Sequence, residues 1–587
     1  MNATKFGGST TNQQTILGHP VGLYVIFFTE MWERFSYYGM RAILVLYLIS
    51  SVEEGGFGWD RADALVLYAF YTGLVYLTPL IGGYIADTYI GFRNAVVLGA
   101  LVMTLGHASL AFEMIPTFYL GIALLILGNG LFKPNMTPIV GQMYPDASPL
   151  KDSAYTIFYM GVNSGAFLGI VLCGWLGETQ GWGYGFGAAG IFMLFGLLQF
   201  RFAEKIFGKI GEKPQGRESQ KDIAKKYGET VVPFSPTDRN LFVSSLSLLG
   251  ATIVGWLYAD DFASFLNIGM PSELYKIPIL LPFVGALVYF IVQRLRKYPK
   301  VERDRLTVIS IFAFFVIFFW LAFEQAGGTM TIFAQDYTER SLSTPTEANA
   351  FRIVSLALTF IPMLILSWVL GGLALKIAKD YPLTIFFTSL SFLIIWGIII
   401  KINMGNFSQE TLEVPASWFG SLNAFFIISL APFFSKMWEK LNKSPKNPSG
   451  PLKLALGLFL LGIGFGALVI GSSSIPQGAE TAAVSMVWLV LAYFFHTVGE
   501  LFLSPVGLSF VNKLSPKRLI ALMFGVWYLA NFVANFTGGM IGSYIDAISE
   551  TSSLSGFFTI FVVSSFAAGG LLLLLNKPLT RMMHGVN

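Results

Sequence analysis

The chain has 587 residues, of which 54% are hydrophobic, 16% are aromatic and 12% are charged, and its mean hydropathy is +0.63. This composition excludes a soluble multidomain protein and predicts an all-α protein that crosses a membrane many times. The net charge of +4 is too small to indicate binding to nucleic acid. The one cysteine, Cys173, excludes an internal disulfide and a metal site built from cysteines.

The N-terminal segment, residues 1–20, is polar and lacks a basic-then-apolar run and a small-residue cleavage site, so we expect no signal peptide. Twelve long apolar segments follow, each able to cross a hydrocarbon core of about 30 Å as a helix of about 20 residues. They lie near residues 21–50, 64–87, 93–114, 117–143, 153–178, 184–203, 305–335, 417–437, 451–472, 483–511, 519–546 and 556–576. Four further candidates, near 241–259, 278–295, 350–375 and 383–402, bring the total to sixteen.

The loops between these segments differ in charge in a regular way. Lysine and arginine gather after residues 203, 295, 375, 435 and 512, whereas the intervening loops are acidic or polar. Basic loops stay in the cytoplasm, so we expect both termini on the cytoplasmic side of a plasma membrane. The resulting divisions are a cytoplasmic tail (1–20), a six-helix bundle (21–204), a cytoplasmic linker (205–240), an extra hairpin (241–304), a second six-helix bundle (305–336 and 417–577), an inserted hairpin (350–403) and a C-terminal tail (578–587).

Two blocks of six helices separated by a charged segment predict the major facilitator fold, with a substrate site near the membrane midplane between two bundles. The stretch "GGYIADTYIGFR" supports this fold, because it places Asp87 and Arg93 in a tight turn after the second helix. We expect these two residues to belong to a gating loop and to make no substrate contact.

The first helix carries an unusual set of charges within "FTEMWERFSYYGMRAIL". At about 100° per residue, with Glu30 at zero, Glu33 falls at about 300°, Arg34 at about 40°, Tyr37 at about 340° and Arg41 at about 20°. These side chains therefore share one stripe that faces away from lipid. Each unpaired charge at a helix centre would cost about 2.5–3.5 kcal/mol, so the charges must be paired or hydrated. A proton relay is the favoured interpretation, and a purely structural ion-pair cluster is the alternative.

Five motifs along the chain carry a family resemblance. They are "EMWERFSYYGMR", "GNGLFKPNM", "FYMGVNSGAF", "FWLAFEQAG" and "GELFLSPVGLS". In this order and spacing, the sequence resembles the proton-dependent oligopeptide transporter family, and in particular the bacterial di- and tripeptide transporters.

The same motifs place further charges inside apolar segments. Lys133 needs an anionic partner, which we expect in Glu30 or Glu33. Glu324 is the expected counter-charge of Arg41, and Glu500 would face these cations from the other half. Cationic side chains on one side of a binding site and an anionic side chain on the other side are complementary to a zwitterion.

The resemblance implies a symporter that moves di- and tripeptides with protons by alternating access, with protons as the coupling ion, no other cofactor and no metal. It implies proton coupling by Glu30, Glu33, Arg34, Lys133 and Glu324. It also implies substrate contacts from Tyr37, Tyr38, Arg41, Tyr76, Lys133, Asn163, Trp320, Asn423, Glu500, Ser504 and Trp527. Phe323 occupies a position where some relatives carry a second acid, so coupling there would rest on one carboxylate. We expect a monomer to be functional.

Several alternatives remain at this point. A family member that carries nitrate or another small metabolite is the main one, and Glu500 favours peptides because an amino terminus needs a carboxylate partner. A membrane-embedded enzyme is disfavoured because the sequence has no Walker A, H-E-x-x-H or G-x-S-x-G motif. A channel would predict repeated pore rings and no proton dependence. The inserted hairpin matches no part of the family core, and we expect it to pack outside the two bundles.

Overall fold

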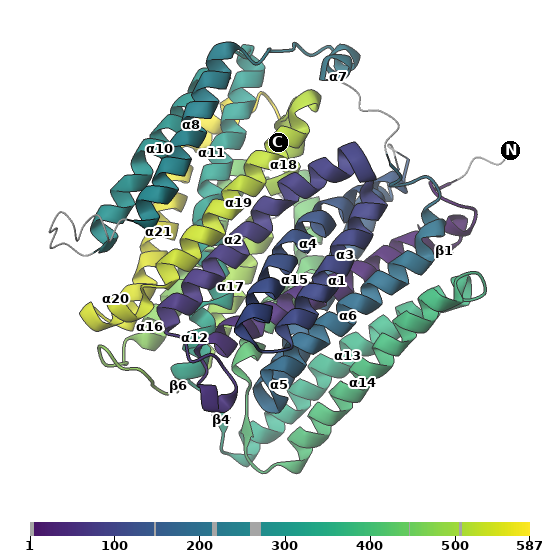
Figure 1. Cartoon of the computed structure of the whole chain (residues 1–587), viewed down its shortest axis with the longest axis vertical. Helices are drawn as coiled ribbons and strands as arrows, with labels where there is room; N and C mark the ends of the chain where they lie inside the picture. Colours follow the sequence, from purple (N-terminus) through teal and green to yellow (C-terminus); the bar gives the residue numbers. More distant parts are fainter. Residues whose placement is uncertain are drawn as a thin grey trace. The chain divides into compact units, whose positions relative to one another are not determined.

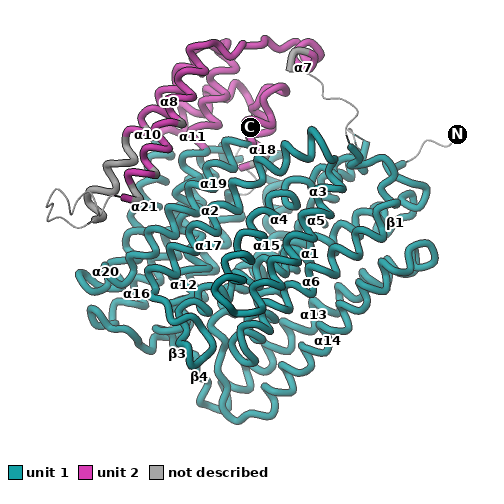
Figure 2. The backbone as a smooth tube through the Cα atoms, in the orientation of Figure 1, with its two compact units in different colours: residues 1–217, 313–506, 525–574 teal, residues 218–312, 507–524, 575–587 magenta. Residues whose placement is uncertain are grey.

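The computed structural model describes residues 5–145, 148–213, 220–258, 272–444, 447–503 and 507–586. The described chain is almost entirely helical (Figure 1). It divides into two compact units, which are described separately (Figure 2). Unit 1 comprises Met1–Arg217, Ala313–Val506 and Gly525–Leu574, and unit 2 comprises Glu218–Phe312, Gly507–Phe524 and Leu575–Asn587.

The first half of the chain supplies six long helices to unit 1. They are α1 (Val21–Ile49), α2 (Arg61–Ile85), α3 (Phe92–Leu110), α4 (Ile115–Gln142), α5 (Lys151–Gln180) and α6 (Trp182–Ala203). Short elements join them: η1 (Thr11–Gln13), β1 (Thr15–Ile16), β2 (His19–Pro20), η2 (Val52–Glu54), η3 (Ala86–Ile90) and η4 (Glu204–Phe207). β1 and β2 form an antiparallel pair.

The second half begins with α11 (Lys300–Phe323), which unit 1 shares from Ala313 onward. The elements that follow in unit 1 are η5 (Glu324–Gly327), α12 (Thr329–Asp336), β3 (Thr338–Glu339), β4 (Ser341–Leu342), α13 (Pro345–Ile377), α14 (Pro382–Ser408), β5 (Leu412–Glu413), η6 (Ala416–Gly420), α15 (Ser421–Asn442), α16 (Gly450–Ser472), β6 (Val484–Ser485), α17 (Val487–Leu503), α19 (Ile520–Gly542, from Gly525 onward), α20 (Ile545–Thr551) and α21 (Leu554–Leu574). β3 pairs with β6 in parallel, and β4 pairs with β5 antiparallel.

Unit 2 holds the segment between the two halves and parts of the second half. Its elements are α7 (Gln220–Tyr227), α8 (Pro236–Leu257), α10 (Ser272–Leu295), the start of α11, α18 (Gly507–Leu514), η7 (Lys517–Leu519), the start of α19 and α22 (Asn576–Met582). Glu229, after α7, accepts hydrogen bonds from the main-chain N–H groups of Lys517 (2.7 Å) and Arg518 (3.2 Å). The Arg518 guanidinium also lies 2.5 Å from Glu302, so two carboxylates fix this arginine.

Twelve helices of the described chain are long and apolar enough to cross a membrane, by length and composition. Within the described residues, each of the sixteen segments expected from the sequence overlaps a helix, and the segment expected over 483–511 falls on α17 and α18. One expectation is wrong in detail, because the single helix expected over 305–335 is interrupted between Phe323 and Thr329. The interruption contains Gly327, where an added Cβ would lie 2.2 Å from the hydroxyl of Tyr68 and 2.7 Å from Arg41 Nε. The break therefore allows side chains of the first half to approach the second half closely.

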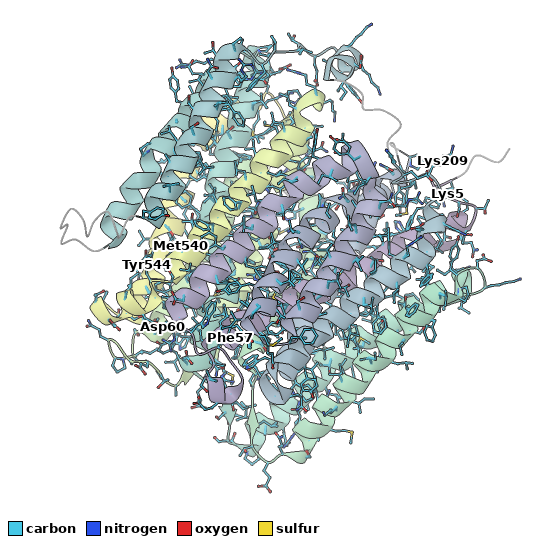
Figure 3. The ribbon with its side chains drawn as sticks, in the orientation of Figure 1. Lys5, Phe57, Asp60, Lys209, Met540 and Tyr544 are labelled. Carbon is cyan, nitrogen blue, oxygen red and sulfur yellow. The ribbon has the colours of Figure 1, made fainter. Side chains whose placement is uncertain are left out.

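Close packing fixes α1 against α5. Cβ atoms added at Gly165 and Gly169 would lie 2.1 Å and 2.2 Å from the carbonyl oxygens of Met31 and Phe35, so only glycine fits at both positions. Side chains mark the two ends of unit 1: Lys5 and Lys209 lie at one end, and Phe57 and Asp60 lie at the other (Figure 3). The substrate-site candidates lie between these ends.

The inserted hairpin consists of α13 and α14. It begins with a capping box, in which the Thr344 hydroxyl accepts from the Glu347 N–H and the Glu347 carboxylate accepts from the Thr344 N–H. α14 packs against α6. The hairpin thus packs on the outside of the first-half helices, although β4 and β5 at its base belong to the second half.

Candidate substrate and proton site

The α1 ion cluster, which we define as Glu30, Glu33 and Arg34, is buried as the helical stripe predicts. Arg34 Nε lies 3.0 Å from Glu30 Oε1 and 2.6 Å from Glu33 Oε2. Asn129 of α4 donates a hydrogen bond of 3.1 Å to Glu33 Oε1. One arginine therefore pairs with two buried acids, and the cluster keeps a formal charge of −1 when both carboxylates are ionised.

Lys133 of α4 meets the sequence expectation in part, because it interacts electrostatically with both Glu30 and Glu33. No ion pair joins it to Glu30 or Glu33 in the described chain, because Arg34 lies between the two acids and pairs with both. Instead, the Lys133 ammonium lies 3.9 Å from the centre of the Tyr76 ring, in a cation–π contact. A cation held by an aromatic face keeps its charge available to an anionic ligand.

Arg41 and Glu324 form the ion pair expected from the sequence, and this pair joins α1 to η5. Tyr68 of α2 completes the contact: its hydroxyl accepts from Arg41 Nε at 2.7 Å and donates to the Glu324 carbonyl at 3.3 Å. The sequence did not identify Tyr68, because a tyrosine within an aromatic-rich helix carries no distinguishing signal.

Glu500 of α17 lies among neutral polar groups. Asn423 of α15 donates 3.0 Å hydrogen bonds to Glu500 Oε2 and to the Thr497 hydroxyl. Asn163 of α5 donates to the Tyr159 carbonyl at 2.9 Å. No cation pairs with Glu500 among the ion pairs of the described residues, and the Glu324 carboxylate acts on it electrostatically beside the Asn423 amide and the Tyr159 hydroxyl.

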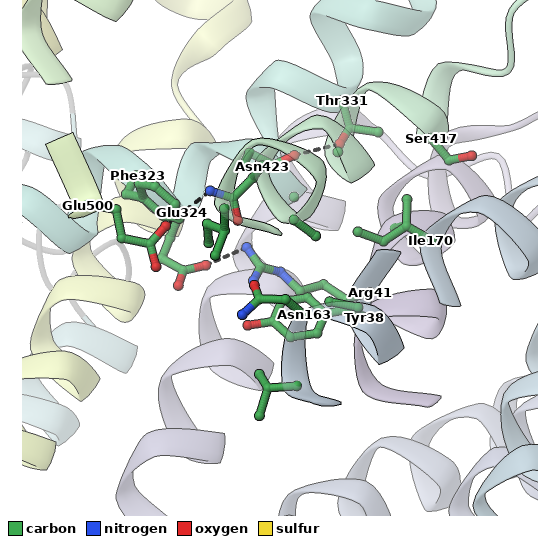
Figure 4. A pocket seen from close by; sticks show the side chains of 18 of the residues that line it. Tyr38, Arg41, Asn163, Ile170, Phe323, Glu324, Thr331, Ser417, Asn423 and Glu500 are labelled. Atoms are coloured by element: carbon green, nitrogen blue, oxygen red, sulfur yellow. Dashed lines mark hydrogen bonds and ion pairs between the residues drawn. The ribbon is translucent and has the colours of Figure 1, made fainter. Parts of the chain in front are cut away.

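A cavity of about 190 Å³ lies between these groups (Figure 4). Eight sequence-predicted residues line it: Tyr38, Arg41, Tyr76, Asn163, Trp320, Glu324, Asn423 and Glu500. Figure 4 shows the Arg41 guanidinium and the Glu324 and Glu500 carboxylates directed toward the same space. The sequence did not identify Tyr159, Phe323, Thr331 or Ser417 as part of this lining.

Of the other residues predicted to contact substrate, Lys133, Tyr37 and Trp527 are not among the described lining residues. Tyr37 is buried and stacks on Tyr71 at 6.3 Å between ring centres, because its helical position directs it toward α2. Trp527 of α19 is buried and does not appear among the described lining residues. Ser504 lies outside the described residues.

At the end of unit 1 that holds Asp60, two contacts join the halves. Arg61 of α2 pairs with Asp336 of α12 at 2.7 Å and with Asp546 of α20 at 2.9 Å. Glu178 of α5 accepts hydrogen bonds from two main-chain N–H groups of η6, at 2.8 Å and 3.0 Å. Sequence reasoning missed both contacts because charges at helix ends rarely reveal their partners.

The two predicted gating residues flank a one-residue turn at Gly91: Asp87 lies in η3, which continues α2, and Arg93 lies in the first turn of α3. Gly91 adopts a φ of 79°, a conformation that favours glycine, and an added Cβ would lie 2.6 Å from the backbone of Glu212. Arg93 pairs with Glu212 at 3.0 Å and donates to the Glu204 carbonyl at 3.1 Å. Asp87 lines a second cavity beside this turn. The segment after η4 is therefore bound to the turn between α2 and α3.

Comparisons with known proteins agree with this architecture. A model of the POT family matches residues 93–384 and 381–563. The chain is 31% identical to the uncharacterized transporter YclF of Bacillus subtilis, over 98% of this chain and 97% of that protein. It is 29% identical to a di-/tripeptide transporter of Lactococcus lactis subsp. cremoris, over 98% of each chain.

A solved structure shows the same fold. The crystal structure of a peptide transporter POT in complex with sulfate superposes with a TM-score of 0.69 and 30% identity, over 97% of each chain. This likeness confirms the all-α, multi-pass membrane fold that the composition and the apolar segments predict.

Proposed function

This chain belongs to the POT family of membrane transporters, and on that premise we propose that it is a proton-coupled symporter of di- and tripeptides. The observation that carries the proposal is the charge arrangement around the cavity. Arg41, paired with Glu324, lies on one side, and Glu500, without a cationic partner in the described chain, lies on the other. A zwitterionic peptide complements this arrangement, because its two ends carry opposite charges.

The peptide is held at both ends. Its carboxylate binds Arg41, which already lies in the cavity, and Lys133, which the Tyr76 ring presents from α4. Its ammonium group binds Glu500 and the side-chain oxygens of Asn163 and Asn423. Tyr38 and Trp320 offer aromatic surfaces to the side chains between the two ends. The charged groups at the two ends of the cavity select peptides by their main-chain length. The apolar side chains between them accept different peptide side chains.

Protonation exchanges one partner of Arg41 for another. A proton on Glu324 removes the charge that holds Arg41, and the guanidinium then takes the peptide carboxylate. Protonation of Glu30 or Glu33 likewise weakens the hold on Arg34. With Arg41 released from η5, the two halves rock and expose the cavity on the opposite side of the membrane. Peptide and proton therefore move together.

The energy of one proton suffices for uptake. A charge that crosses 100 mV releases about 2.3 kcal/mol, which supports about 50-fold accumulation of a neutral solute. The transporter works as a monomer in the plasma membrane of a bacterium with both termini in the cytoplasm. The basic loops and the bacterial sources of the relatives support this location.

A nitrate transporter with the same fold is the competing function. Nitrate has no ammonium group, so Glu500 would repel it without compensation. The test is uptake of labelled dialanine into proteoliposomes under an imposed inward proton gradient, with labelled nitrate in parallel. Accumulation of dialanine above the level reached without a gradient is expected. Nitrate uptake without dialanine uptake would overturn the proposal.

A further inference from the structure

The inserted hairpin contacts the first-half helices along much of their length. Phe387 of α14 stacks on Phe202 of α6 with ring centres 5.8 Å apart. Toward the other end of the helix, the Lys401 ammonium lies 3.3 Å from Gln180 Oε1 and 5.6 Å from the Trp175 ring centre. These contacts distinguish α14 from a helix that touches only lipid.

α14 has a polar buried face and an apolar exposed face. Thr384, Thr388 and Ser391 recur at helical spacing and have no exposed surface, whereas Phe386 and Leu393 are 56% and 68% exposed. Hydroxyl groups turned away from lipid need partners within the protein. The hydroxyl groups of Thr384 and Thr388 both contact Gln199 of α6.

Gln199 of α6 connects α14 to α1. Its carboxamide oxygen lies 2.8 Å from the Thr388 hydroxyl, whose single proton it shares with the Thr384 carbonyl at 2.7 Å, and it accepts from the Trp32 indole N–H at 3.2 Å. Its carboxamide nitrogen donates to the Val25 carbonyl at 2.9 Å and to the Thr29 hydroxyl at 3.1 Å. Gln199 thus uses both the oxygen and the nitrogen of its carboxamide, and three of the four partners of this carboxamide belong to α1.

An aromatic contact reinforces this connection. The Phe392 ring of α14 meets the rings of Phe28 and Trp32 edge to face, with centres 5.6 Å and 5.7 Å apart. On the helical projection of α1, Trp32 falls about 200° from Glu30. The hairpin therefore reaches the face of α1 opposite the α1 ion cluster.

We propose that Thr388, acting through Gln199, is a positioning residue that holds α1 so that Glu33 stays within hydrogen-bond distance of Asn129 of α4. This inference rests on the proposed proton-coupled function. Glu30, Glu33 and Arg34 all lie on α1 and move together, so a small rotation or shift of α1 changes the contact of this cluster with α4, where Asn129 donates to Glu33 Oε1 at 3.1 Å. The glycines of α5 fix α1 from one side, and Gln199 with Thr388 and Phe392 fixes it from another.

Other titratable groups surround these acids. Lys133 of α4 interacts electrostatically with both carboxylates, Tyr71 of α2 interacts with Glu33, and Tyr528 of α19 interacts with Glu30 and Arg34. Within the described chain, none of these groups forms a hydrogen bond with Thr388. A change at Thr388 therefore acts on coupling through the position of α1.

The test compares three hairpin variants in proteoliposomes. Thr388→Val removes the hydroxyl with little change of shape, and Thr388→Ser retains it. Thr359→Val is the matched control, because Thr359 is equally buried and accepts from Asn403 at 3.2 Å, but bonds only within the hairpin. Two quantities are measured: gradient-driven dialanine uptake as a function of pH, and hydrogen exchange of the main-chain amides of residues 25–36.

Thr388→Val is expected to reduce the gradient-driven accumulation of dialanine about three- to tenfold. Loss of one buried hydrogen bond changes an equilibrium constant by about this factor. The pH of half-maximal uptake should rise, because a Glu33 carboxylate that loses the hydrogen bond from Asn129 takes up its proton more readily. Dialanine counterflow should change little, and amide exchange in residues 25–36 should increase. Thr388→Ser should restore the wild-type pH profile.

Two results would overturn the inference: a pH profile unchanged by Thr388→Val, or the same change in Thr359→Val as in Thr388→Val. The second result would mean that any loosening of the hairpin has this effect. If the wild type accumulates no dialanine, the proposed function fails. The exchange comparison between Thr388→Val and Thr359→Val then still decides whether the hairpin holds α1.

Discussion

Arg41 of α1 and Glu324 of η5 form a buried ion pair that joins the two halves of the chain across the central cavity. The pair forms where the helix of the second half is interrupted, and Gly327 leaves room for Arg41 and Tyr68 at this point. Removal of either charge would leave the other buried without its partner, which typically costs about 3–5 kcal/mol. The same pair therefore contributes to stability and controls the availability of Arg41.

Glu324→Gln tests this dual role. The amide keeps the shape of the carboxylate without its charge and imitates the protonated state permanently. We expect gradient-driven accumulation of dialanine to fall at least about tenfold, whereas counterflow without a gradient persists. Glu410→Gln, at an exposed glutamate before β5, serves as the control and should behave as wild type. Equal loss of accumulation and counterflow would show that Glu324 is needed for binding or folding and does not act in coupling.

The α1 ion cluster allows a second prediction. Glu30→Gln and Glu33→Gln should each abolish accumulation while part of the counterflow remains, because the groups that bind peptide are unchanged. Glu33→Gln should also lower the unfolding temperature more, since Glu33 is fully buried and holds both Arg34 and Asn129. Counterflow and accumulation are measured in the same proteoliposome preparation. A parallel loss of both activities would identify a purely structural cluster.

Glu500 is expected to recognise the amino end of the peptide. Glu500→Gln should weaken binding of dialanine about 10- to 100-fold, the range for a hydrogen bond that involves a charged group. N-acetyl-dialanine lacks the ammonium charge, so its weaker binding should change little in the variant. Competition against labelled dialanine measures both ligands. Equal losses for the two ligands would assign Glu500 another role.

The contact of Glu229 with η7 predicts a pH-dependent stability. Burial raises the pKa of Glu229, but hydrogen bonds from the main-chain N–H groups of Lys517 and Arg518 and from the Arg518 side chain outweigh burial, so its pKa lies below the ordinary 4.5. A lowered folded-state pKa stabilises the protein above the unfolded-state pKa, and this contribution disappears as the pH falls through the folded-state pKa.

Glu229→Gln should therefore lower the unfolding temperature near neutral pH, and the difference from wild type should shrink as the pH falls below 4.5. Thermal unfolding of the detergent-purified proteins across this pH range measures the effect, with Glu410→Gln as the exposed control. A difference that stays constant down to acid pH would show that the carboxylate charge of Glu229 contributes nothing to this contact.

Much of the fold is predictable from the sequence because the bilayer imposes a simple rule. Each span must satisfy its main-chain hydrogen bonds internally, so long apolar runs become helices. The charges of α1 are predictable for the same reason, since buried charges must share a face and find partners. The pairing of Arg41 with Glu324 follows from that argument, and the structure contains it.

The remaining features depend on contacts between distant segments. Lys133 was expected to pair with an acid of α1, but Arg34 is nearer to both acids and Tyr76 offers an alternative face. The interruption at η5 was missed because two adjacent glycines in an apolar run do not by themselves distinguish a broken helix from a continuous one. The link from Thr388 through Gln199 involves residues that are ordinary in sequence, and only their packing against α1 gives them a role.

The most direct test of the account is whether dialanine itself carries protons across the membrane. Proteoliposomes would contain a pH-sensitive dye, with no initial pH gradient and with the membrane potential clamped by potassium and valinomycin. Addition of external dialanine should acidify the interior in wild type and not in Glu324→Gln. Uptake of labelled dialanine by wild type without internal acidification would contradict coupling, and acidification by nitrate in place of dialanine would contradict the proposed substrate.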